Sequence, residues 1–297
     1  KPLYDLPGAA AMGALTCYLS DNPAILALAH DQTFRRFFHR YQIPALTNLG
    51  TSFGMGLIVT TFMMGQGSGF GRAALLGNLG AFAGSIVSVR LMLLSTKKLY
   101  GTEEWAATAT TADMLAAPAD ADSVVLERSV ASRALDALLT GGQRGVELGM
   151  AVIPGVLIIC TSVLMLTNGP SESGTYTGAA FEGVPVLPWL GQKIAFITKP
   201  LFGFQAAEAI AFPITALGAV GAALSLVPAF LAQGLIGGNE IAVFTAMGMC
   251  WSGYLSTHIA MMDALDCREL TSKAIFAHTI GGIVAGVVAH FAYLWLG

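Results

Sequence analysis

The sequence predicts an all-α fold, a polytopic bundle of transmembrane helices with inverted repeats and discontinuous or re-entrant helices. Only 11% of the 297 residues are charged and 55% are hydrophobic, whereas soluble domains are usually about 25% charged. The 35 glycines agree with this class, because glycine is commoner in membrane helices than in soluble ones. The net charge of −3 is too small to indicate nucleic acid as a partner.

Several apolar stretches are long enough to cross a bilayer without a break. The hydrocarbon core of a bilayer is about 30 Å thick and takes about 20 residues of helix. We therefore expect uninterrupted spans at residues 43–64, 74–96, 147–167, 241–265 and 274–296.

Two further apolar stretches contain interruptions. Residues 6–29 include Ser20-Asp21-Asn22-Pro23, and residues 186–236 include Lys199-Pro200, Gln205, Glu208, Pro213 and Pro228. Proline removes an amide donor and disfavours helix in the residue before it. Non-helical backbone at membrane depth must be buried in protein or line a wet cavity. We therefore expect discontinuous or re-entrant segments at 6–29 and 204–231, and kinked continuous helices are the alternative.

The charged loops predict the orientation of the chain. Arginines occur in the loop 30–42, and lysines and arginines occur between residues 97 and 145. By the positive-inside rule both loops are cytoplasmic. The loop 99–146 is the longest polar part, and apolar residues at helical spacing predict an amphipathic helix over 123–139. The loop 168–185, without lysine or arginine, then lies outside.

The order of the predicted elements occurs twice. A broken segment, a span and a glycine-rich span follow one another within residues 1–98, and again within residues 147–297. Matched loops fall on opposite sides of the membrane, so the two halves are expected to form an inverted repeat. The span 147–167 would open the second repeat, and its partner is expected before Lys1. Paired interrupted segments in the two halves of such a repeat indicate the substrate site of a transporter.

Ionisable groups inside a membrane usually mark function. Asp21 and Glu208 lie at the two interruptions, so the repeat predicts that their carboxylates converge near the midplane. The candidate substrate-binding residues are Ser20, Asp21, Asn22, Thr47, Asn48, Gln205, Glu208, Asn239, Glu240, Ser256 and His258. Helix capping is the alternative for Asp21 and for the pairs Thr47–Asn48 and Asn239–Glu240, and hydrogen bonding between helices is the alternative for Ser256.

No cofactor or metal site is expected. His278 and His290 are more than three helical turns apart, so they cannot share one metal ion. A coupling proton or Na⁺ fits the interrupted segments, because free carbonyl groups and helix ends can bind ions there. His258 could take part, because histidine titrates near neutral pH.

Short motifs resemble a known family. They are Ser20-Asp21-Asn22-Pro23-Ala24-Ile25, Ala45-Leu46-Thr47-Asn48-Leu49-Gly50, Phe53-Gly54-Met55-Gly56 and Glu208-Ala209-Ile210-Ala211-Phe212-Pro213. The chain resembles bacterial multi-spanning permeases related to the Gate, or nucleoside-recognition, membrane proteins, a group that includes spore-maturation membrane proteins. The resemblance implies a transporter in the bacterial cytoplasmic (inner) membrane, without a settled substrate.

The leading hypothesis is a secondary transporter, not an enzyme, for a small polar or cationic solute bound between two broken helices. The expected partners are the lipid bilayer and the solute, with a homo-oligomer left open. One alternative is an accessory subunit of a membrane assembly. Another is a rhomboid-like intramembrane serine protease, because Cys250-Trp251-Ser252-Gly253 is close to a Gly-x-Ser-Gly motif and His290 could supply a base.

Overall fold

A computed structural model describes residues 2–106 except positions 23 and 31, residues 182–297, and part of the segment between 129 and 179. The chain forms two compact units. The first comprises residues 1–107 and 159–297, and the second comprises residues 108–158. In the second unit the described positions from Ala131 onward are helical. About half of the predicted amphipathic helix at 123–139 and most of the predicted span at 147–167 lie outside the described residues.

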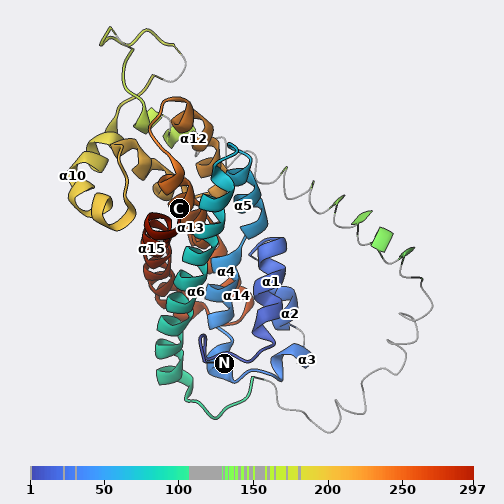
Figure 1. The fold of residues 1–297 in the computed structure, drawn as a ribbon. Helices are drawn as coiled ribbons and strands as arrows, with labels where there is room; N and C mark the ends of the chain where they lie inside the picture. The colour runs from blue at the N-terminus through green and yellow to red at the C-terminus, as the bar shows by residue number, and fades with distance from the viewer. Residues whose placement is uncertain are drawn as a thin grey trace. The chain divides into compact units, whose positions relative to one another are not determined.

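The described part of the first unit is helical, which confirms the all-α class (Figure 1). Within these residues the one β-type contact is an isolated bridge between His39 and Trp105. Three helical stretches, Arg40–Met64, Phe70–Tyr100 and Arg268–Leu296, are long and apolar enough to cross a membrane. The membrane class expected from composition therefore agrees with the described helices.

Two long helices, α6 (Phe70–Tyr100) and α15 (Thr271–Leu296), pack along each other and confirm the spans expected at 74–96 and 274–296. Glycine residues at the contact allow the backbones of the two helices to lie close together. A Cβ on Gly84 would lie 2.3 Å from the carbonyl oxygen of Gly281, and one on Gly80 would lie 2.4 Å from that of Ala285. Small residues commonly allow such close packing between membrane helices.

The first expected interruption is present. Helix α1 (Ala10–Leu19) ends before Ser20, and α2 (Ala24–His30) begins after Pro23. Short helices follow at α3 (Gln32–Arg35) and η1 (Arg40–Gln42).

Two spans expected to be continuous contain a break, so their continuity was wrongly predicted, although Arg40–Met64 as a whole is long and apolar enough to cross a membrane. Residues 43–64 form α4 (Ala45–Phe53) and α5 (Gly56–Met64), and residues 241–265 lie in α13 (Gly238–Cys250) and α14 (Tyr254–Ala264). Met55 has a φ of 54° and Gly253 a φ of 68°. An α-helix needs φ near about −63°, so a left-handed residue ends one helix before the next begins.

Within residues 186–236 the chain is non-helical at Gln205, as expected, but the expected breaks at Pro200, Pro213 and Pro228 are absent. The elements are α10 (Val186–Phe202), η2 (Ala207–Ile210), α11 (Ala211–Ala216) and α12 (Val220–Ala232). Helix α10 continues through Pro200, and α12 continues through Pro228. Pro213 lies in the first turn of α11, where an amide has no acceptor within the helix. The 3-10 helix η3 (Arg268–Leu270) precedes α15.

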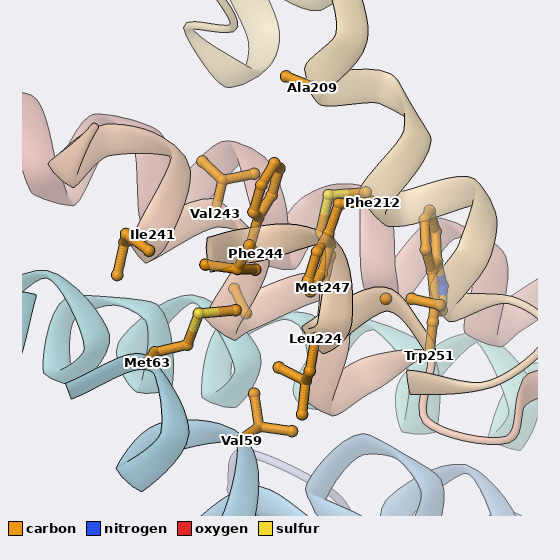
Figure 2. Packing of buried hydrophobic residues seen from close by; sticks show 14 of the residues in the cluster. Val59, Met63, Ala209, Phe212, Leu224, Ile241, Val243, Phe244, Met247 and Trp251 are labelled. Carbon is orange, nitrogen blue, oxygen red and sulfur yellow. The ribbon is translucent and has the colours of Figure 1, made fainter. Parts of the chain in front are cut away.

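A hydrophobic core surrounds α13 (Figure 2). The rings of Phe212 on α11 and Phe244 on α13 stack with centroids 4.1 Å apart. Val59 and Met63 of α5 pack into the same core, and both are fully buried. This packing holds α13 in the centre of the first unit, with polar groups gathered near each of its ends.

Candidate functional site

Three of the described helix interruptions meet at one point, which we name the helix-break centre and define by Asn22, Gly54 and Ser252. The side-chain amide of Asn22 donates to the carbonyl oxygen of Ser252 over 2.5 Å. Ser252 Oγ lies 3.1 Å from Asn22 Oδ1, 3.0 Å from the carbonyl oxygen of Gly54 and 3.1 Å from that of Met249, and it donates its single proton to one of the three. The α1–α2 and α13–α14 interruptions are therefore joined by the Asn22–Ser252 bond, and the α4–α5 interruption lies within hydrogen-bonding distance of Ser252.

The centre is closely packed. Asn22 is 2% and Ser252 1% exposed. A Cβ on Gly54 would lie 1.1 Å from Asn22 Oδ1 and 2.8 Å from Ser252 Oγ. Only glycine at position 54 leaves room for the Asn22 carboxamide. The side chains that meet here carry no formal charge.

A chain of buried hydrogen bonds lies beside the helix-break centre. We name Asn48, Ser88 and His278 the interior polar chain. Asn48 Nδ2 donates to Ser88 Oγ over 2.9 Å, and Ser88 Oγ lies 2.9 Å from His278 Nδ1. His278 Nε2 is bonded to the carbonyl oxygen of Cys250, which can only accept. The proton of neutral His278 is therefore on Nε2, and the Ser88 hydroxyl donates to Nδ1.

A second histidine packs against this chain. The rings of His258 on α14 and His278 on α15 have centroids 4.7 Å apart, and both side chains are fully buried. His258 Nδ1 donates to the carbonyl oxygen of Tyr254 over 2.6 Å. His258 Nε2 lies 3.5 Å from Thr51 Oγ1, which already donates to the carbonyl oxygen of Thr47 over 2.8 Å.

Two buried polar atoms of α4 have no partner among the described residues, namely Thr47 Oγ1 and Asn48 Oδ1. Native proteins rarely leave such groups without a hydrogen bond. The interior between α4, α6, α14 and α15 thus retains hydrogen-bonding capacity that the described side chains do not satisfy.

A different set of polar residues surrounds the start of α13, and we name Gln205, Asn239, Glu240 and His290 the α13 N-terminal cluster. Glu240 is 3% exposed, and its carboxylate accepts the backbone amides of Gln205 over 3.3 Å and Gly237 over 3.0 Å. His290 Nδ1 lies 2.6 Å from Asn239 Oδ1. Asn239 Nδ2 donates over 2.9 Å to the carbonyl oxygen of Phe202, the last residue of α10.

The structure therefore divides the single site expected from the sequence. Asn22, Thr47, Asn48 and His258 lie at or beside the helix-break centre. Gln205, Asn239 and Glu240 lie at the other end of α13, and Glu208 follows in η2. His278 lies beside the helix-break centre and His290 lies in the α13 N-terminal cluster. The two histidines are about 18 Å apart along α15 at a rise of roughly 1.5 Å per residue.

The prediction that the Asp21 and Glu208 carboxylates converge was wrong, because the two residues lie towards opposite ends of α13. Asn22, next to Asp21, contacts the residues just beyond α13, whereas Glu208 belongs to the region at its start. Asp21 Oδ1 accepts the amide of the next residue, Asn22, over 2.7 Å, which is not the bond to a helix amide that the capping alternative requires. Ser20 is exposed, and the side chain of Ser256 lies outside the described residues.

The protease alternative is also not supported by the geometry. Ser252 lies two residues beyond the end of α13, while His290 bonds Asn239 in the first turn of that helix. The two are at opposite ends of α13, so His290 cannot act as a base for Ser252. The described residues contain no group of three His, Cys, Asp or Glu side chains that could hold a metal ion.

Sequence reasoning did not place Gly54, Ser88 or His278 in a site. The Phe53-Gly54-Met55-Gly56 motif was the available signal, but the apolar length of residues 43–64 favoured a continuous helix. Comparison with known proteins found no matching family model, no matching curated protein and no matching solved structure. Membership of the Gate-related permeases stays a prediction.

Proposed function

We propose that the protein is a secondary transporter that binds a small polar solute at the helix-break centre. The observation that carries this proposal is the meeting of three helix interruptions through Asn22, Gly54 and Ser252. Interrupted helices in a membrane leave backbone donors and acceptors that must be satisfied by protein, by water or by a ligand. Transporters use such interruptions to bind substrate between their repeats.

The order of the elements supports an inverted repeat. The pairs α1–α2 and α4–α5 precede the long helix α6, and the pairs α11–α12 and α13–α14 precede the long helix α15. The α6 and α15 helices, in matching places, pack against each other. In this arrangement the α4–α5 interruption corresponds to the α13–α14 interruption, and Ser252 Oγ lies 3.0 Å from the Gly54 carbonyl oxygen.

The chemistry of the centre favours an uncharged polar solute over a cation. Asn22 and Ser252 are neutral, and the carboxylate of Asp21 already accepts a backbone amide. Buried cations need a paired charge or several oxygen ligands. A nucleoside, which the resemblance to the nucleoside-recognition group also suggests, offers hydroxyl and amide groups that can replace the Asn22–Ser252 bonds.

The proposal is tested by the thermal stability of the purified full chain in detergent with uridine, adenosine, glycerol or ethanolamine. A ligand at a hundred times its Kd stabilises a protein by about 2.7 kcal/mol, which raises the melting temperature measurably. We expect an uncharged probe to raise it, and ethanolamine to have less effect.

Variants assign the effect to the site. Asn22→Ala and Ser252→Ala should abolish the ligand-induced rise. Asn78→Ala is the matched control, because Asn78 also joins two helices, through a 2.9 Å bond to Thr60, but does not contact the centre. If no probe stabilises the wild type, or if Asn78→Ala abolishes the rise as fully as Asn22→Ala, the proposed site is wrong. The accessory-subunit hypothesis is then the better one.

A further inference from the structure

A cavity of about 340 Å³ lies between the second half of α10 and the residues that follow it. Its wall is formed by two segments of the chain, namely residues 204–208 and, on α10, Gly191, Gln192, Ala195, Thr198 and Lys199. The polar lining residues are Gln192, Thr198, Lys199, Gln205 and Glu208. The cavity is distinct from the helix-break centre, because it lies beside the α13 N-terminal cluster.

The two walls of the cavity are held in fixed positions. A Cβ on Gly191 would lie 2.2 Å from the carbonyl oxygen of Ala207, so α10 and η2 are in close backbone contact. Gln205 Nε2 donates over 3.1 Å to the carbonyl oxygen of Gly203, and the Gln205 amide donates to buried Glu240.

The turn between the walls is equally constrained. Gly203 has a left-handed φ of 70°, and a Cβ on it would lie 2.4 Å from the ring of His290. The chain after α10 is therefore a packed turn rather than a loose loop, and it sets the place of Glu208 relative to Lys199.

Opposite charges face this cavity without neutralising each other. Among the residues that the structure describes, neither the Lys199 ammonium nor the Glu208 carboxylate has a salt-bridge partner. Lys199 is exposed and Glu208 is partly exposed, so both charges are open to a ligand that enters the cavity. A ligand with one carboxylate and one ammonium group would satisfy both, whereas a simple anion or cation would satisfy only one.

We propose that this cavity binds a free α-amino acid in its zwitterionic form. Lys199 would bind the carboxylate and Glu208 the ammonium group. The amides of Gln192 and Gln205 can bind a polar side chain, and Phe204 supplies an apolar wall. A volume of about 340 Å³ is at the small end of ligand pockets, which are typically about 300–1,000 Å³, and it suits a solute of this size.

The charge requirement can be tested with three related ligands on the purified full chain in detergent. L-alanine carries both charges, L-alaninamide only the cation, and N-acetyl-L-alanine only the anion. By isothermal titration calorimetry, we expect L-alanine to bind at least tenfold more tightly than either analogue. Glycine and L-glutamine should bind as well. The proposal is overturned if no amino acid binds, or if one analogue binds as tightly as L-alanine.

Variants locate the site. Lys199→Met and Glu208→Gln should each weaken L-alanine binding at least tenfold, and Lys199→Met should affect L-alaninamide little. Lys193→Met is the matched control on the same helix, because its ammonium lies 6.0 Å from the Trp189 ring and not in the cavity. Equal binding by wild type, Lys199→Met and Glu208→Gln would overturn the assignment, as would an equal loss in Lys193→Met.

L-alanine binding at this cavity does not depend on the proposed transport site at the helix-break centre. Asn22→Ala, which alters the helix-break centre, should leave L-alanine binding unchanged. If the uncharged probes fail at the centre while L-alanine still binds, the transport proposal fails and the amino-acid site stands. A loss of L-alanine binding in Asn22→Ala would overturn the second site.

Discussion

Replacing Gly54 by alanine perturbs the helix-break centre with a single methyl group. The new Cβ would lie 1.1 Å from Asn22 Oδ1 and 2.2 Å from Asn22 Cγ, so the two cannot occupy the same space. The backbone of Gly54, with φ −59° and ψ 135°, is one that alanine adopts easily. The effect therefore comes from packing and hydrogen bonding and not from backbone strain.

The size of the effect follows from the contacts that are lost. The Asn22 side chain must move, which breaks its bonds to Ser252 and leaves buried groups unsatisfied at about 1–3 kcal/mol. Overpacking of a tight core adds about 1–3 kcal/mol. Alanine restores about 0.4–1 kcal/mol by restricting the unfolded chain. We expect the free energy of unfolding to fall by about 2–5 kcal/mol in total.

The assay is equilibrium unfolding in mixed micelles of dodecyl maltoside and SDS, followed by tryptophan fluorescence. Gly8→Ala is the control, because a Cβ there meets nothing within 4 Å. A double variant with Asn22→Ala should be less destabilised than the sum of the two single variants. The coupling should be about 1–3 kcal/mol, since the two residues share one space.

Two results would refute this reasoning. If Gly54→Ala unfolds within about 0.5 kcal/mol of Gly8→Ala, Asn22 does not occupy the space beside Gly54. If Gly54→Ala and Asn22→Ala are additive, the clash is with another group, and the three interruptions do not meet as described.

Two further predictions concern other parts of the fold. On α6, Gly84→Ala should lower the free energy of unfolding by more than about 2 kcal/mol, because its Cβ would meet the Gly281 backbone. In the same assay Gly71→Ala should be neutral or stabilising by up to about 1 kcal/mol. If Gly84→Ala and Gly71→Ala changed the free energy of unfolding equally, the described α6–α15 packing would be contradicted. In the loop before α10, a hydrogen bond from the Thr177 side chain, helped by nearby backbone amides, lowers the pKa of Glu182. The ionised Glu182 carboxylate stabilises the loop fully above the ordinary carboxyl pKa. This stabilisation is lost as pH falls through the lowered pKa of Glu182. The protection of the Thr177 amide against hydrogen exchange, relative to its intrinsic rate at each pH, should then fall on acidification, and Glu182→Gln should lack this protection at every pH.

The two long helices were predictable because local composition was sufficient. Residues 74–96 and 274–296 are long and apolar, and they form parts of α6 and α15. The first interruption was predictable as well, because proline disfavours helix in the residue before it and the Asp21 side chain bonds the neighbouring Asn22 amide. These features depend on residues within one or two turns of each other.

The other interruptions were not predictable in this way. Residues 43–64 contain no proline beyond Pro44, and the left-handed residue in this stretch is Met55, a type that rarely adopts that conformation. The carbonyl oxygen of its neighbour Gly54 lies 3.0 Å from Ser252 Oγ, 198 residues away in the chain. Conversely, Pro200 and Pro228 lie within helices that their surroundings stabilise.

By itself the sequence determined the class of the protein, the long helices α6 and α15, and the break at Asn22, because each follows from hydrophobicity or from chemistry between near neighbours. The tertiary structure decided where α4 and α13 end, and that Asn22 meets Ser252 while Glu208 lies at the other end of α13. Such pairings depend on which helix ends come together when the bundle packs. A hydrogen bond between residues 230 apart leaves no periodic pattern in either segment.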